Sequence, residues 1–233
     1  MLAQVEEQER AAFLRGQARG MGALAHRLSA LVEDLREDLG ELTASGAEAP
    51  AAQATARLAD LIRTINAAVR ADEMGRRLLE PREPVSLAWL VGDLIRALDR
   101  EWRRRGITLT IEAHPETPCV HGPLGPLEEA VSALLLNAGD AAGQGGTVHV
   151  AVAPEAGAWV SLRVADSGPG FSPQRAGKAA LAFVSSKGDP HPGLGLFLAE
   201  MVATTLGGCL ILGNGNGGGG LATMRLPAAE ISE

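Results

Sequence analysis

Apolar residues in the first eighty positions recur with the spacing of amphipathic helices. In residues 5–42 they lie three, four or seven positions apart, at Leu14, Met21, Leu24, Leu28, Leu31, Leu35 and Leu42. Gln17 and Asp38 interrupt this heptad seam. A second helix is predicted over residues 52–79, with one apolar side formed by Leu58, Leu61, Ile62, Ile65, Val69 and Leu78. The polar segment 43–50 ends in a proline and joins the two helices into an αα-hairpin.

A single hairpin of this kind leaves part of its apolar seam exposed to water. Pairing with a second copy into a four-helix bundle covers the seam, so we expect a homodimer. In the alternative arrangement, the helices form an arm that packs on the next domain of the same chain. The hairpin is assigned to residues 1–80 and the second domain to residues 81–233.

The second domain begins at PREPVS (81–86), whose two prolines end the helical pattern. Beyond this segment, helical and alternating patterns are mixed. Helices are predicted over 87–105, 123–142 and 193–206, and strands over 107–112, 118–121, 146–152, 158–166, 208–213 and 221–226. This order predicts an α+β chain whose second domain is an α/β sandwich, with helices on one face of a mixed sheet. The glycine run 213–220 lies between two strands and is interpreted as a mobile hairpin turn.

Composition and charge argue against several classes of protein. The chain of 233 residues carries a net charge of −7, which gives nucleic-acid binding no electrostatic support. No apolar run reaches the roughly 18–20 residues of a membrane span, and the acidic N-terminus lacks the apolar region of a signal peptide. Cys119 and Cys209 have no metal-ligand spacing, so both are expected as free thiols. We therefore expect a cytoplasmic chain with no membrane segment and no nucleic-acid partner.

Two segments of the second domain carry polar residues at positions suited to a nucleotide. LLLNAGDAA (134–142) places Asn137 on an apolar helix, where a buried amide needs a partner such as Mg²⁺, and Asp140 follows one turn later. In DSGPGF (166–171), Asp166 ends a strand, and its carboxylate is suited to accept a hydrogen bond from the amino group of adenine. Gly168 and Gly170 permit positive φ and close approach of a base. Taken singly, an ordinary helix end and a plain turn are the alternatives.

A third segment, GLGLFLAE (193–200), has the pattern of a glycine-rich helix start. The main chain of Gly193, Leu194, Gly195 and Leu196 offers free N–H groups at the positive end of the helix dipole, which suits a phosphate. A lone GxG is a weak signal. In this order and at these distances, however, the three segments together indicate one binding site for ATP.

Residues 82–227 resemble the catalytic ATP-binding domain of bacterial sensor histidine kinases, in the GHKL superfamily. LLLNAGDAA is similar to their Asn box, DSGPGF to their first glycine box, and FVSSK with PGLGLFLAEMVATTLGG to their Phe box and second glycine box. The resemblance implies a Bergerat-type fold with ATP and Mg²⁺ as cofactors. It makes Asn137 the ligand of Mg²⁺ and Asp166 the partner of adenine. It also assigns the lid and phosphate contacts to Gly168, Gly170, Gly193 and Gly195.

The same resemblance places Lys187 in an ATP lid formed by residues 171–192. A lysine there is suited to contact a phosphate, and a solvated loop lysine is the alternative.

Residues 1–80 resemble the dimerisation and histidine-phosphotransfer hairpin of the same kinases. GMGALAHRLSALVEDL (20–35) is similar to their histidine box, which makes His26 the implied phosphoacceptor. With Met21 and Leu28 at a and Leu24 at d, His26 falls at f on the outer surface. The implied activity is Mg-ATP-dependent autophosphorylation on His26, followed by transfer to an aspartate of a response-regulator receiver domain. A merely exposed surface histidine is the alternative.

Three departures from the family pattern leave a second function open. Arg27 stands where the family commonly has an acid, and Ala30 stands where an Asn or Thr orients water for dephosphorylation. Ala133 stands where the family usually has an Asn and hydrolytic members have a Glu, so rapid ATP hydrolysis is not favoured. The alternative is an atypical phosphotransfer or scaffold protein with weak or no kinase activity.

Overall fold

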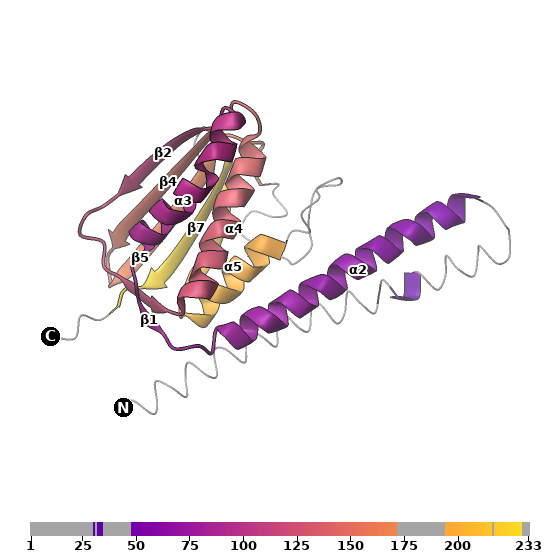
Figure 1. The fold of residues 1–233 in the computed structure, drawn as a ribbon, viewed down its shortest axis with the longest axis horizontal. Helices are drawn as coiled ribbons and strands as arrows, with labels where there is room; N and C mark the ends of the chain where they lie inside the picture. Colours follow the sequence, from indigo (N-terminus) through magenta and orange to yellow (C-terminus); the bar gives the residue numbers. More distant parts are fainter. Residues whose placement is uncertain (1–29, 31, 35–47, 172–193, 216, 230–233) are drawn as a thin grey trace.

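The computed structural model describes residues 30, 32–34, 48–171, 194–215 and 217–229. The first predicted helix, residues 5–42, therefore lies almost entirely outside the described residues. The second predicted helix is confirmed as α2 (Glu48–Arg77), which extends away from the other labelled elements in Figure 1. The predicted four-helix bundle stays a prediction, because it depends on the first helix.

α2 has apolar side chains on two different sides. On one side, Ala67, Ala71 and Met74 are buried and belong to the same apolar cluster as the core of the second domain. The C-terminal part of this side contacts α4 and α5. On the other side, Leu58, Ile62, Ile65 and Val69 are exposed, and we call these four residues the α2 stripe.

The second domain contains a mixed sheet, as the sequence predicts, built from five of the six predicted strands; the strand predicted over 118–121 lies outside this sheet. Its strand order is β2-β4-β5-β7-β6, with β2 parallel to β4 and every other neighbouring pair antiparallel. The bounds are β2 (Thr108–Ala113), β4 (Thr147–Glu155), β5 (Trp159–Asp166), β6 (Cys209–Asn214) and β7 (Gly220–Pro227). Because β5 and β7 are antiparallel neighbours, the end of β5 lies beside the start of β7.

Three helices cover one face of this sheet, as Figure 1 shows. They are α3 (Leu87–Arg104), α4 (Leu124–Ala142) and α5 (Leu194–Thr205). The N-cap of α3 is Ser86, whose hydroxyl accepts the N–H of Trp89 and so satisfies one of the free donors of the first turn. The boundaries of all three helices agree with the sequence prediction within one residue.

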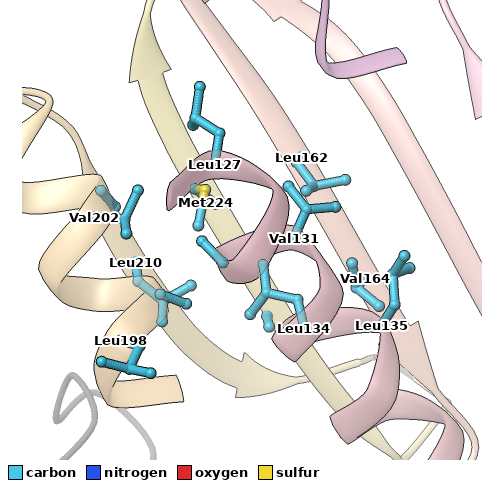
Figure 2. Packing of buried hydrophobic residues seen from close by; sticks show 14 of the residues in the cluster. Leu127, Val131, Leu134, Leu135, Leu162, Val164, Leu198, Val202, Leu210 and Met224 are labelled. Atoms are coloured by element: carbon cyan, nitrogen blue, oxygen red, sulfur yellow. The ribbon is translucent and has the colours of Figure 1, made fainter. Parts of the chain in front are cut away.

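α4 is the central element of the core. In Figure 2 its side chains Leu127, Val131, Leu134 and Leu135 lie among apolar side chains of α5 and the strands, and all four are buried. The indole of Trp102 packs from α3 against Gly139, where a Cβ would lie 2.9 Å from the indole nitrogen. Packing on three sides therefore holds α4 in place, and with it the polar residues of its last two turns.

The structure adds one element that the sequence did not predict. Within the segment interpreted as a break, β1 (Glu83–Val85) pairs antiparallel with β3 (Val120–Gly122) in a separate two-stranded sheet. Among the described residues, we find no helix with the length and apolar character needed to cross a membrane.

Candidate nucleotide site

The carboxylate of Asp166 is held rigidly at the end of β5. Its Oδ1 accepts the main-chain N–H of Gly168 at 2.8 Å and of Gly220 at 3.1 Å, and the residue is only 9% exposed. Its Oδ2 accepts no hydrogen bond within the described part of the chain. A buried carboxylate oxygen without a partner is costly. The arrangement therefore leaves one acceptor oriented for a ligand.

Gly168 brings the turn after β5 against the C-terminal end of α4. A Cβ at this position would overlap the carbonyl oxygen of Ala141, so only glycine fits. Gly170 has φ of +75°, a conformation that L-residues rarely adopt. Both glycines that the sequence singled out are therefore required by local geometry, one by close approach and one by its dihedral angle.

The glycine run between β6 and β7 contributes to this site, which sequence reasoning missed. Gly219 has φ of +78°, and a Cβ there would overlap the carbonyl oxygen of Asp166. A Cβ at Gly220 would lie 2.6 Å from Oδ2 of Asp166. The run is a hairpin turn, as predicted, but its last two glycines also form one wall around the carboxylate. A signal was present, because the run has more glycines than a two-residue hairpin turn requires.

Asn137 lies on the side of α4 that faces these elements. One turn before Asn137, Ala133 lies close to Gly195 of α5. A Cβ added to Gly195 would be 3.1 Å from the Cβ of Ala133. One turn after Asn137, the carbonyl of Ala141 contacts Gly168. Residues four apart share a helix face, so half-buried Asn137 is placed between the start of α5 and the Asp166 turn. Its amide makes no hydrogen bond to any described residue.

The remaining predicted site residues fall into three groups. Leu194 and Leu196 lie in the first turn of α5 with Gly195, Leu194 buried and the other two half-buried. Asp140 is exposed on α4 and forms an ion pair with Arg105 at 3.0 Å, and its contribution to nucleotide binding stays a prediction. His26, Lys187 and Gly193 lie outside the described residues.

Comparisons with known proteins show what this chain is similar to. Residues 124–230 match the family model of the histidine kinase-, DNA gyrase B-, and HSP90-like ATPases. Over 219 residues, or 88% of this chain, the sequence is 27% identical to the sensor histidine kinase ZraS of Escherichia coli K12, of which 46% is covered. The ZraS of Klebsiella oxytoca is 28% identical over 218 residues, with the same coverage. This chain thus spans about half the length of these curated relatives.

Solved structures of histidine kinases have the same fold. The mycobacterial sensor histidine kinase MprB superposes with a TM-score of 0.55 at 28% identity, covering 64% of this chain and 99% of that one. Full-length ShkA in complex with AMPPNP superposes with a TM-score of 0.61 at 19% identity, covering 92% of this chain and 46% of that one.

The matched segment contains β5, α5 and the whole face of α4 described above. It is similar to the histidine kinase-, DNA gyrase B-, and HSP90-like ATPases. Together, the family match, the curated relatives and the solved structures support a sensor histidine kinase core, as the sequence resemblance implied.

The residues of the ATPase domain fit a magnesium nucleotide. The described residues contain no group of three or more His, Cys, Asp or Glu side chains placed to hold a metal ion. Mg²⁺ often binds through one or two protein oxygens and the phosphates of its nucleotide, and it keeps several waters. The unpaired amide of Asn137 offers one such oxygen, so the site suits an ion that arrives with ATP.

The close approach at Gly168 yields a direct prediction for the ATPase domain. We expect Gly168→Ala to weaken ATP binding by about tenfold or more and to lower stability by about 1–3 kcal/mol, because the new methyl group overlaps the end of α4. Titration with ATP and thermal denaturation measure the two effects. The matched control is Gly92→Ala on α3, where a Cβ meets nothing closer than 4.0 Å. This control should bind ATP normally and be as stable or slightly more stable.

Proposed function

We propose that this chain is the kinase core of a two-component sensor. It binds Mg-ATP in residues 82–227 and transfers the γ-phosphoryl group to His26. The group then passes to an aspartate on the receiver domain of a response regulator. The chain acts as a homodimer in the cytoplasm. The observation that carries this proposal is that the Asp166–Gly168 turn packs against the end of α4, the helix that carries Asn137, within the segment that matches the ATPase family model.

Each group in the site has a role in binding the nucleotide. The free Oδ2 of Asp166 accepts a hydrogen bond from the amino group of adenine, while Gly168 lets the base approach the main chain. The amide oxygen of Asn137 holds Mg²⁺, which neutralises phosphate charge when bound. The first turn of α5, around Gly195, offers free N–H groups to the phosphates. These roles suit positioning and transfer of a phosphoryl group.

In the transfer step, a neutral imidazole nitrogen of His26 attacks the γ-phosphorus. A nitrogen–phosphorus bond forms as the bond from phosphorus to the β–γ bridging oxygen breaks, and ADP leaves. The imidazole proton passes to water, because the neighbouring Arg27 is a cation and accepts no proton. Autophosphorylation is therefore expected to be slower than in kinases with an acid at this position.

The α2 stripe supports the homodimer. Leu58, Ile62, Ile65 and Val69 follow one another at intervals of four, three and four residues, which is the spacing of a helical packing seam. Each is between 46% and 57% exposed in the single chain, although the opposite side of α2 is already buried. A second copy of the chain supplies the matching surface, since it carries the same stripe.

A second candidate function rests on the contact between α4 and α5. The methyl group of Ala133 packs against Gly195, so this part of the site contains no polar side chain from position 133. Together with Arg27 and Ala30, this favours a phosphotransfer or scaffold protein that keeps the fold and has weak or no kinase activity.

Incubation with γ-labelled ATP tests the proposal. We expect acid-labile label on the protein and loss of nearly all of that label in His26→Ala, because the nucleophile is removed. The control His121→Ala, at an exposed histidine of β3, should keep full label. Adding the receiver domain of the cognate regulator should then remove the label from the kinase. ATP binding without label would favour the second candidate. Equal label on His26→Ala would contradict the assignment of the acceptor.

A further inference from the structure

The side chain of Asn214 is paired with the main chain of Phe171. Asn214 is the last residue of β6, and Phe171 closes the DSGPGF turn, 43 positions earlier. The Phe171 N–H donates to Oδ1 of Asn214 at 2.7 Å, and Nδ2 of Asn214 donates to the Phe171 carbonyl at 3.0 Å. The amide thus satisfies both polar groups of one residue, as a neighbouring strand would.

This pairing requires a close approach that the sequence permits. A Cβ at Gly170 would lie 2.7 Å from Oδ1 of Asn214, so the glycine is needed for the amide to reach the main chain. The positive φ of Gly170 turns the chain toward β6 at the same point. The hydrogen bonds of Asn214 and the backbone of Gly170 therefore fix the end of the turn relative to the sheet.

The paired main chain carries an aromatic ring beside the free oxygen of Asp166. A Cβ added to Gly220 would lie 3.1 Å from Cε2 of Phe171 and 2.6 Å from Oδ2 of Asp166, so both atoms are close to this glycine. The ring edge and the carboxylate oxygen therefore border the same small space above Gly220. The Phe171 ring is half-buried and packs on the apolar core, so its location depends on where its main chain is held.

We propose that Asn214 is a positioning residue for recognition of the nucleobase. It acts through the main chain of Phe171, which it holds so that the ring and Oδ2 of Asp166 flank the base from two directions. This inference rests on the proposed binding of ATP. It adds that selectivity for adenine depends on a residue of the edge strand β6 as well as on Asp166.

The test compares ADP with inosine diphosphate, which has a carbonyl oxygen in place of the amino group of adenine. An acceptor such as Oδ2 of Asp166 favours the amino group, so the wild type should bind ADP at least about tenfold more tightly. In Asn214→Asp, a carboxylate oxygen replaces Nδ2 and repels the Phe171 carbonyl. We expect the affinity for ADP to fall about tenfold and the preference over inosine diphosphate to fall below about threefold.

The matched control is Asn66→Asp, the same change of charge at an exposed position on α2. It should leave both affinities unchanged. A purely structural role of Asn214 would lower the melting temperature without changing the ratio of the two affinities, and an unchanged ratio overturns the inference. If Asn214→Asp fails to fold, the same criterion applies to Asn214→Ser, whose hydroxyl is still able to accept the Phe171 N–H. Absence of ADP binding to the wild type would instead overturn the proposed function, and this inference with it.

Discussion

Asp166→Asn is expected to weaken ATP binding by roughly 10- to 100-fold while leaving the fold intact. Two main-chain N–H groups hold Oδ1 of Asp166, so the amide oxygen of the variant takes that position and the amide nitrogen faces the ligand. A donor then meets the amino group of adenine, which is also a donor. Isothermal titration with ATP measures the loss, and thermal denaturation checks the fold.

Asp93→Asn is the control for this change. Asp93 pairs with Arg96 on the exposed surface of α3, and such surface pairs contribute about 1 kcal/mol or less. We expect ATP affinity equal to that of the wild type. If the two variants bind ATP equally well, Asp166 is not the residue that recognises adenine.

The second large effect is expected for the α2 stripe. Replacing both Ile62 and Ile65 by Glu removes apolar side chains from the dimer interface and introduces repelling charges. Full burial of an isoleucine contributes about 1.5–3 kcal/mol, and Ile62 and Ile65 are already about half buried in the single chain, so each contributes about half of this value to the interface. With two substitutions in each of two copies, this corresponds to a loss of roughly two to four orders of magnitude in dimer affinity. Sedimentation equilibrium should show a dimeric wild type and a monomeric variant.

Leu79→Glu provides the control for the dimer prediction. Leu79 is 69% exposed in the turn after α2 and lies outside the stripe. This variant should remain dimeric. A wild type that is monomeric at all concentrations, or a stripe variant that dimerises as well as the wild type, would contradict the proposed interface. ATP binding should survive in the stripe variant, because its substitutions lie outside the ATPase domain.

Local pattern was sufficient to predict most of the fold. The apolar residues of α4 repeat with helical period and are buried against the other elements of the core, so burial confirms the face that the sequence indicated. The alternation in β4 and β5 predicted two strands, and the structure pairs them antiparallel. β1 escaped prediction because it has three residues, one of them a proline, and forms only by pairing with β3.

For the site, the sequence by itself determined which residues are the candidates for nucleotide binding. Asp166, Gly168, Gly170 and Asn137 were predicted because an acid before a glycine turn and an amide on an apolar helix are locally unusual. Only the tertiary structure decided which groups meet them. Gly220 reaches Oδ1 of Asp166 from 54 positions away, and Asn214 pairs with Phe171. The physical reason is that periodicity and turn chemistry report on neighbours in the chain, whereas these hydrogen bonds exist only after β5, β6 and β7 have formed one sheet.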